Sequence, residues 1–198
     1  MEEYSVYNDI SKRTNGEFYL GVCGPVRTGK STFIKKFMEM FVLPGIRDEN
    51  DRKRAMDELP QSAEGKTIMT TEPKFIPKEA VKINLFDGND IKVRMVDCVG
   101  YIVEDAGGLM EGERERMVMT PWSEEPMPFA KAAEYGTKKV IHDHSTIGIV
   151  ITTDGSFGDI SRQSYKAAED KTISELKSIG KPFIVIVNSA NPFGEKAK

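Results

Sequence analysis

The chain has 198 residues, with 28 lysines and arginines against 31 aspartates and glutamates, a formal charge of −3 and 39% hydrophobic residues. This length is enough for one domain with a sizeable core, and the slight negative charge gives no general electrostatic reason to bind nucleic acid. No apolar stretch approaches the length of a membrane span, and the acidic N-terminus does not resemble a secretory signal. The cysteines, Cys23 and Cys98, each end an apolar run, so we expect two small buried hydrophobes and a reducing, cytoplasmic setting.

A glycine-rich motif follows the first predicted strand. Residues 1–17 are expected to be a polar lead-in, and the apolar run at 18–23 predicts a buried strand. Residues 24–31 then read Gly-Pro-Val-Arg-Thr-Gly-Lys-Ser, the P-loop pattern of nucleoside triphosphate binding. Apolar residues at helical spacing in 32–41 predict a helix directly after it. Strand, loop and helix in this order are the context that the motif requires, so we expect a P-loop domain over 18–198.

Each position of the motif has a physical role in holding a triphosphate. The glycines let successive backbone N–H groups point inward at phosphate oxygens, and the following helix directs its positive end to the same place. Lys30 is expected to reach the β- and γ-phosphates, and the Ser31 hydroxyl to bind Mg²⁺. Arg27 either places its charge on the phosphates or points to solvent. The predicted nucleotide-binding residues of this segment are Gly24, Val26, Arg27, Thr28, Gly29, Lys30, Ser31 and Thr32.

A polar loop comes next along the chain. Residues 48–59 carry closely spaced charges of both signs and predict a solvated helix, and residues 60–73 predict an exposed loop. Thr70 and Thr71 lie in this loop, where a threonine of switch-type nucleotide hydrolases binds Mg²⁺ and senses the γ-phosphate. Thr67 is a third candidate. We expect at least one of the three to act in this way, with an ordinary polar loop role as the alternative for each.

Two alternating apolar runs predict a hairpin. The runs at 80–85 and 91–96 are joined by turn residues at 87–90, which leave no room for a crossover helix, so one strand should be antiparallel. Asp97 and Gly100 follow the second run. A carboxylate at this strand end can associate with Mg²⁺, and a glycine N–H can reach the γ-phosphate. A simple turn residue is the alternative for Asp97.

The second half of the chain adds further elements and two open questions. Residues 100–128 predict an irregular segment in which Trp122 either belongs to an assembly surface or is buried at a sheet edge. Residues 154–156, Asp-Gly-Ser, either face the nucleotide or form a plain turn. The remaining predicted elements are a helix at 129–142, a strand at 147–152, a helix at 161–179 with Ser161 as its cap, and a strand at 183–187.

The P-loop, the loop threonines, the Asp-x-x-Gly sequence at 97–100 and the antiparallel second strand together resemble the translation-factor-like (TRAFAC) class of P-loop GTPases. The resemblance covers almost the whole chain. It implies an α/β fold with a mostly parallel, doubly wound sheet and one antiparallel strand. Many members place a water-orienting glutamine after Asp-x-x-Gly, whereas this chain has Tyr101. A phenol is not equivalent to that glutamine, so we expect slow hydrolysis.

The sequence departs from this class in the motif that recognises the guanine base. GTPases of the class carry Asn-Lys-x-Asp after the last predicted strand, and this chain carries Asn-Ser-Ala-Asn at 188–191. Aspartate accepts two hydrogen bonds from guanine, whereas an asparagine amide offers one acceptor and one donor, which match the amino group and ring nitrogen of adenine. We therefore predict ATP over GTP, with Asn188 and Asn191 among the nucleotide-binding residues.

A closer resemblance rests on four stretches, at 24–32, 70–77, 96–101 and 119–122. They are similar to the stage IV sporulation protein A family, the spore-coat morphogenetic ATPases of endospore-forming bacteria. The resemblance runs from the N-terminus to residue 198 and covers only the N-terminal ATPase domain of that family. We therefore expect this chain to be a piece of a longer protein, in agreement with the lack of a covering helix after the last predicted strand.

The resemblance implies an unusual activity. The family uses ATP hydrolysis with Mg²⁺ to drive self-assembly into a polymer, which forms the basement layer of the coat on the forespore surface, in the mother-cell cytoplasm. It is anchored through a small amphipathic membrane peptide, stage V sporulation protein M, and recruits other coat proteins. Carried over by position, Lys30 is the P-loop lysine, Asp97 the Mg²⁺-associated carboxylate, and Thr70 and Thr71 the sensor threonines.

Two other functions remain open from the sequence. A regulatory GTPase would use the same loops to bind effectors. Competition between ATP and GTP for binding separates it from an ATPase. A structural module would bind nucleotide without productive turnover, and phosphate release separates it from an enzyme.

Overall fold

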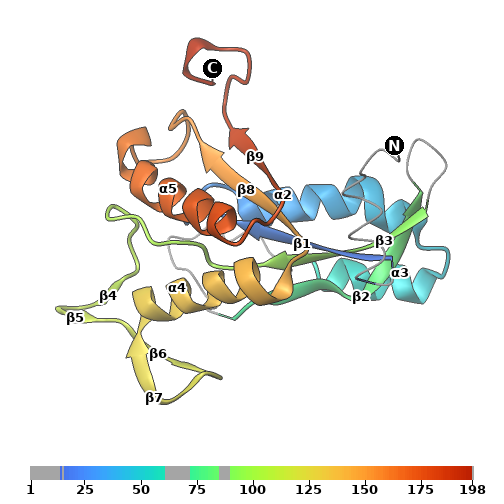
Figure 1. Ribbon diagram of the computed structural model, residues 1–198, viewed down its shortest axis with the longest axis horizontal. Coiled ribbons are helices and arrows are strands. Elements are labelled where there is room, and N and C mark those ends of the chain that lie inside the picture. The colour runs from blue at the N-terminus through green and yellow to red at the C-terminus, as the bar shows by residue number, and fades with distance from the viewer. Residues whose placement is uncertain (1–13, 15, 61–71, 85–89, 198) are drawn as a thin grey trace.

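A five-stranded, mainly parallel β-sheet runs through the centre of the computed structural model (Figure 1). The structure describes residues 14, 16–60, 72–84 and 90–197. The strands of this sheet are β1 (Glu17–Cys23), β2 (Lys74–Asn84), β3 (Asp90–Asp97), β8 (Ile147–Thr153) and β9 (Phe183–Asn188). Their order is β2-β3-β1-β8-β9, and every neighbouring pair is parallel except β2 with β3. The predicted α/β fold with one antiparallel strand is confirmed.

Helices cover both faces of the sheet, because side chains alternate along each strand. One face packs against α2 (Lys30–Phe37). The opposite face packs against α5 (Arg162–Ser178) and the π-helix Val140–His144, which extends α4 (Phe129–Lys139). The strand residues that meet α2 include Val22, Met95, Ile149 and Ile151, and those on the other face include Cys23, Val96 and Val150. Burial of these alternating apolar side chains stabilises a doubly wound arrangement.

The predicted helices are present, with small differences at their ends. α2 is followed by a π-helical turn at Met38–Val42. α3 (Glu49–Asp57) begins after Asp48, whose carboxylate accepts two backbone N–H groups, and α5 begins after the predicted cap Ser161. Short 3-10 helices cover Leu43–Gly45 and Glu195–Ala197. None of the helices in the described residues is both long and apolar enough to cross a membrane.

The segment at 100–128 is more regular than the sequence predicted. It contains two small antiparallel hairpins, which extend away from the central sheet (Figure 1). Their strands are β4 (Met110–Glu111), β5 (Arg114–Glu115), β6 (Met117–Thr120) and β7 (Ser123–Pro128). Most of their side chains are exposed, so there is no alternation of apolar and polar residues to indicate strands. Trp122 is partly buried, with its ring 5.1 Å from that of Tyr135 on α4.

The hairpin of β2 and β3 also differs from the prediction. β2 begins at Lys74, six residues before the predicted strand start at 80. Its register against β3 shifts between Ile76 and Val81, around Pro77. Proline has no N–H for the ladder, and this lack obscures the strand pattern in the sequence. The predicted turn at 87–90 lies largely outside the described residues.

Candidate functional site

The P-loop connects the end of β1 to the start of α2, at the centre of the sheet. Its backbone turns sharply: Gly24, Arg27 and Gly29 all have positive φ, at 126°, 61° and 93°. A Cβ on Gly29 would lie 2.6 Å from the side-chain nitrogen of Asn188, so only glycine fits there. Successive backbone N–H groups in such a turn form an anion-binding concavity, and α2 adds the positive end of its dipole.

Lys30 lies inside this turn rather than in solvent. It is 5% exposed, and its Nζ donates a hydrogen bond of 2.5 Å to the carbonyl oxygen of Pro25. The Thr28 hydroxyl donates to the same carbonyl at 3.0 Å. Burial lowers the pKa of Lys30, since water no longer solvates the ammonium group. A buried cation at the loop is suited to receive a phosphate oxygen.

Asp97 and Ser31 meet beside the lysine. The Ser31 hydroxyl donates to Oδ2 of Asp97 at 3.1 Å. The other carboxylate oxygen, Oδ1, is buried and has no hydrogen-bond partner among the described residues. Burial raises the pKa of Asp97, while nearby Lys30 opposes that shift. A hydroxyl and a carboxylate with an unpaired oxygen are hard oxygen ligands, the kind that Mg²⁺ prefers, so these residues fit the ion.

The segment after Asp97 is bonded to the P-loop. The N–H of Tyr101 donates to Gly24 O at 3.2 Å, and the N–H of Val26 donates to Tyr101 O at 2.9 Å. The N–H of Gly100, predicted to face the γ-phosphate, donates to the Thr137 hydroxyl at 3.1 Å. These bonds make the loop and this segment one continuous backbone layer around Lys30.

The side chains of Tyr101 and Arg27 are directed away from the P-loop. Tyr101 is 3% exposed, and its hydroxyl donates to the carboxylate of Glu175 on α5. This bond and burial raise the pKa of the phenol, with burial as the larger cause. A guanidinium nitrogen of Arg27 lies 3.5 Å from Gly107 O. The sequence carried no signal for Thr137 or Glu175, because each lies more than 35 residues from its partner in the chain.

The end of β9 meets the P-loop through Asn188. Its side-chain N–H donates to Thr28 O at 3.1 Å. This bond joins the last strand of the sheet to the loop after the first, 160 residues apart in the chain. Asn188 therefore holds the end of β9 against the P-loop.

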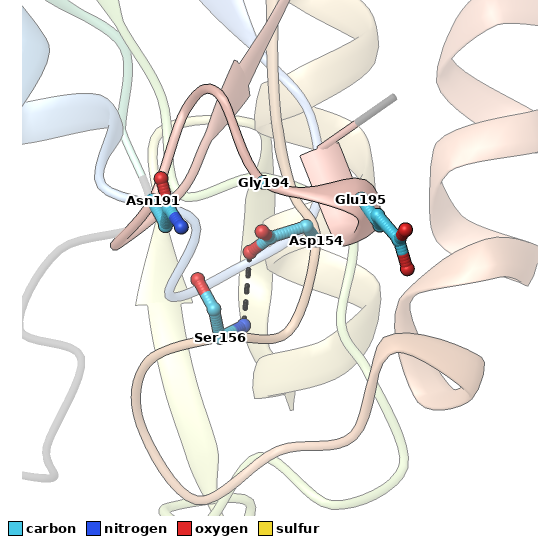
Figure 2. A pocket seen from close by; sticks show the side chains of 5 residues that line it. All are labelled: Asp154, Ser156, Asn191, Gly194 and Glu195. Carbon is cyan, nitrogen blue, oxygen red and sulfur yellow. Dashed lines mark hydrogen bonds between the residues drawn. The ribbon is translucent and has the colours of Figure 1, made fainter.

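A pocket of about 250 Å³ lies beyond Asn188, at the ends of β8 and β9. Figure 2 shows its lining residues, which are Asp154, Ser156, Asn191, Gly194 and Glu195. The N–H of Ser156 donates to Oδ1 of Asp154 at 2.9 Å, and the Ser189 hydroxyl donates to Oδ2 at 2.6 Å. A hydrogen bond from the Ser156 side chain, then that of Ser189, and more weakly the backbone N–H of Ser156, lower the pKa of Asp154. The pocket therefore contains an ionised carboxylate at neutral pH.

The predicted site residues fall into two groups in the structure. Asp97 and Gly100 lie beside Lys30 of the P-loop, and Asn188 is bonded to the same loop at Thr28, whereas Asn191 lies in the pocket with Asp154. Thr32, on the first turn of α2, has an exposed side chain. Thr67, Thr70 and Thr71 lie outside the described residues. Within the described ranges, no three His, Cys, Asp or Glu side chains form a cluster that could hold a metal.

This sheet order, the P-loop and the nearby aspartate agree with the comparison to known proteins. Over residues 1–198 the chain matches the family described as stage IV sporulation protein A, ATPase domain. The chain belongs to this family. It is thus an ATPase domain of the stage IV sporulation protein A family, as its sequence motifs predicted.

The stage IV sporulation protein A relatives are similar over nearly all of this chain. Identity is 60% over 193 residues with the protein of Bacillus subtilis (strain 168), which covers 98% of this chain and 39% of the relative. It is 58% with that of Bacillus anthracis and 59% with that of Clostridioides difficile (strain 630), again over 98% and 97% of this chain and 39% of each relative. The chain thus spans well under half the length of these relatives.

Among solved structures, a dimerization-deficient mutant of Toc33 from Arabidopsis thaliana is similar at a TM-score of 0.38 and 11% identity. The match covers 94% of this chain and 77% of that one.

Proposed function

We propose that this chain binds ATP together with Mg²⁺ at the P-loop and hydrolyses it slowly. The observation that carries the proposal is the pair of Ser31 and Asp97, 3.1 Å apart beside buried Lys30, with one carboxylate oxygen unpaired. An ionised carboxylate with an unpaired buried oxygen costs free energy unless a cation or donor reaches it. A divalent ion would remove that cost and also meet the phosphates held by the loop.

Different groups around Lys30 would bind the phosphates and the metal ion. Backbone N–H groups of the P-loop and the start of α2 bind the phosphate oxygens, and Lys30 compensates their charge. Ser31 and Asp97 would hold Mg²⁺, which when bound neutralises charge on the phosphates. Gly100 stays a candidate for the γ-phosphate, with its N–H 3.1 Å from the Thr137 hydroxyl in this structure. We also propose Thr70 and Thr71 as sensors in the preceding loop.

Slow turnover follows from Tyr101. Its hydroxyl donates to Glu175 on α5, so the phenol is directed to the helix layer and away from the phosphates. A water molecule attacking the γ-phosphate therefore gets no orientation from this side chain. Switch enzymes without a complete set of catalytic groups hydrolyse far less than one triphosphate per second.

We propose adenine as the base, with Asn191 in contact with it. Asn191 lines the pocket at the ends of β8 and β9, on the side of the P-loop where Asn188 bonds to Thr28. Its amide offers one acceptor and one donor, which suit adenine.

Membership in the sporulation family supports a wider proposal for the whole protein. ATP hydrolysis would drive self-assembly into the basement layer of the spore coat, at the forespore surface in the mother cell. The partners would be a second copy of the protein, a small amphipathic membrane peptide and other coat proteins. Switch segments that differ between the ATP and ADP states would couple hydrolysis to assembly.

One experiment tests both proposals. In the full-length protein, Lys30→Ala and Asp97→Ala should each lower phosphate release from ATP by about 100-fold or more, because each removes a charged group that acts on the phosphates. Sedimentation of the same samples with ATP should recover polymer from the wild type and not from these variants.

Lys36→Ala is the matched control. Lys36 lies on the same helix as Lys30 and is exposed, where it pairs with Glu39 at 2.8 Å. Its removal should leave phosphate release and sedimentation unchanged. Wild-type rates in both site variants would overturn the enzyme proposal, and equal assembly with ATP and ADP would overturn the assembly proposal alone.

A further inference from the structure

A buried threonine on α4 is bonded to the backbone group that is proposed to meet the γ-phosphate. We infer that Thr137 is a positioning residue of the ATPase site: its hydroxyl holds the N–H of Gly100 while no γ-phosphate is present and gives it up to that phosphate when ATP binds. This inference rests on the proposed binding of ATP. It adds to the site a residue that lies on a helix, outside every sequence motif of the P-loop region.

The location of Gly100 is the first argument. A Cβ on Gly100 would lie 2.6 Å from Nζ of Lys30 and 2.2 Å from Gly24 O, so its backbone is packed against the P-loop. Lys30 is the side chain proposed to reach the γ-phosphate, and a phosphate oxygen bound to it would lie close to Gly100. In the structure the N–H of Gly100 instead donates to the Thr137 hydroxyl at 3.1 Å.

The second argument is that the Thr137 hydroxyl is held as an acceptor by its own helix. Thr137 is fully buried, and its hydroxyl donates to Ala133 O, one turn earlier in α4, at 2.7 Å. With its proton directed to that carbonyl, the oxygen accepts the N–H of Gly100.

The Cys98 thiol is a weaker alternative partner for the same N–H. Burial raises the pKa of Cys98 to about 11, and hydrogen bonds from the Thr137 hydroxyl and the Gly100 N–H are among the causes that oppose this shift. A neutral thiol sulfur is a weak acceptor, so Thr137 is the principal partner of Gly100.

The exchange of partners needs only a local rotation of the peptide group that carries this N–H. The next residue is fixed, because the N–H of Tyr101 donates to Gly24 O at 3.2 Å and its carbonyl oxygen accepts the N–H of Val26 at 2.9 Å. Gly100 has a φ of 95°, and glycine adopts a wide range of backbone angles at little cost. The N–H can therefore turn from Thr137 to the phosphate while the P-loop keeps its hydrogen bonds.

The bond to Thr137 favours the protein without a γ-phosphate. ADP leaves the N–H of Gly100 with Thr137, whereas ATP gains a bond to this N–H only after the bond to Thr137 is broken. A ligand shifts a two-state equilibrium by the difference between its affinities for the two states. The Thr137 hydroxyl therefore weakens the binding of ATP relative to ADP, and it favours the return of Gly100 to α4 after hydrolysis.

Thr137→Val in the full-length protein is the first test, because valine keeps the shape of threonine and removes the acceptor. The N–H of Gly100 then lacks its principal partner until a γ-phosphate arrives. Affinity for a non-hydrolysable ATP analogue with Mg²⁺ should rise about three- to tenfold relative to affinity for ADP. A purely structural role would lower both affinities by the same factor. Thr137→Ser restores the hydroxyl and should restore the wild-type ratio.

Thr172→Val is the matched control. Thr172 on α5 is also fully buried, and its hydroxyl donates to Ala168 O, one turn earlier, at 2.8 Å. Within the described ranges of the chain, no N–H donates to that hydroxyl. Thr172→Val should therefore lose stability in thermal unfolding and keep the wild-type ratio of ATP to ADP affinity.

A structure of the wild-type, full-length protein tests the same exchange without a substitution. With Mg²⁺ and the ATP analogue, the N–H of Gly100 should bond to a γ-phosphate oxygen and lie beyond hydrogen-bond distance of the Thr137 hydroxyl. With ADP, the bond to Thr137 should remain. An N–H that stays bonded to Thr137 with the ATP analogue would overturn the inference even if Thr137→Val does not fold.

The outcomes separate this inference from the proposed function. If Thr137→Val leaves the ratio of ATP to ADP affinity unchanged or lowers it, or if Thr137→Ser or Thr172→Val raises it equally, positioning by Thr137 is wrong and the ATPase proposal stands. If the wild type binds neither nucleotide, the ATPase proposal fails and the inference fails with it.

Discussion

The two ends of the candidate nucleotide site are built in different ways. Around Lys30, backbone groups from neighbouring segments bond to one another, and Val26 and Cys98 next to them are almost fully buried. At the pocket, side chains from two loops converge, and Asn191 is exposed. One end is a continuous backbone layer and the other a set of polar side chains that face an open pocket.

This difference agrees with what we propose that each end binds. A triphosphate is the same in every nucleotide, so fixed N–H groups, one cation and one carboxylate are sufficient. A base is distinguished only by the order of donors and acceptors on its edge, so side chains must supply that order. Substitutions at the phosphate end should therefore affect all nucleotides, and substitutions at the pocket should affect the preference among them.

The strongest test of the phosphate end is Gly100→Ala. Gly100 has a φ of 95°, and a Cβ there would lie 2.2 Å from Gly24 O and 2.6 Å from the Lys30 ammonium nitrogen. Neither the backbone oxygen nor the buried lysine can move cheaply. We expect a loss of at least about 3 kcal/mol in the free energy of unfolding, together with loss of ATP binding. Chemical denaturation and nucleotide titration measure the two effects.

Gly112→Ala is the matched control for Gly100→Ala. Gly112 also has a positive φ, 65°, but a Cβ there would have nothing within 4 Å. Its substitution should cost only the conformational strain, about 1 kcal/mol, with normal ATP binding. If both alanine variants lose equal stability, close packing at Gly100 is not the cause.

Asn188→Ala tests the connection between the two ends. The variant loses the hydrogen bond to Thr28 O, so the P-loop should be less well ordered. Affinities for ATP, GTP and tripolyphosphate should all fall by a similar factor, about five- to tenfold. Asn191→Ala, three residues along, should leave tripolyphosphate binding as in the wild type. A change confined to ATP in Asn188→Ala would instead make Asn188 a base-reading residue.

Tyr101→Phe should have the smallest effect. The variant removes the hydroxyl that donates to Glu175, but Lys138 remains 3.8 Å from that carboxylate. We expect a loss of about 1 kcal/mol in stability, measured by denaturation. Phosphate release should change by less than about twofold, because the phenol does not face the phosphates. A tenfold slower release with unchanged stability would show that Tyr101 acts in catalysis.

Regular patterns made most of the fold predictable. The continuous apolar runs of β1 and β8, the alternation in β3 and the helical spacing in α5 each reflect how the element is buried, so strand and helix types followed from the sequence. The hairpins β4–β5 and β6–β7 were missed because most of their side chains are exposed, and apolar and polar residues do not alternate along their strands. The early start of β2 was missed because Pro77 interrupts the ladder there.

The sequence by itself determined which residues meet at the phosphate end. The motif at 24–31 is contiguous, and Asp97 follows its strand directly, so local spacing was enough to assign Lys30, Ser31 and Asp97 to one site. Only the tertiary structure decided the direction of Tyr101, the hydrogen bond of Asn188 to the P-loop and the hydrogen bond of Ser189 to Asp154. Those contacts join loops more than 30 residues apart, and no local pattern in a chain records which distant side chain will complete a hydrogen bond.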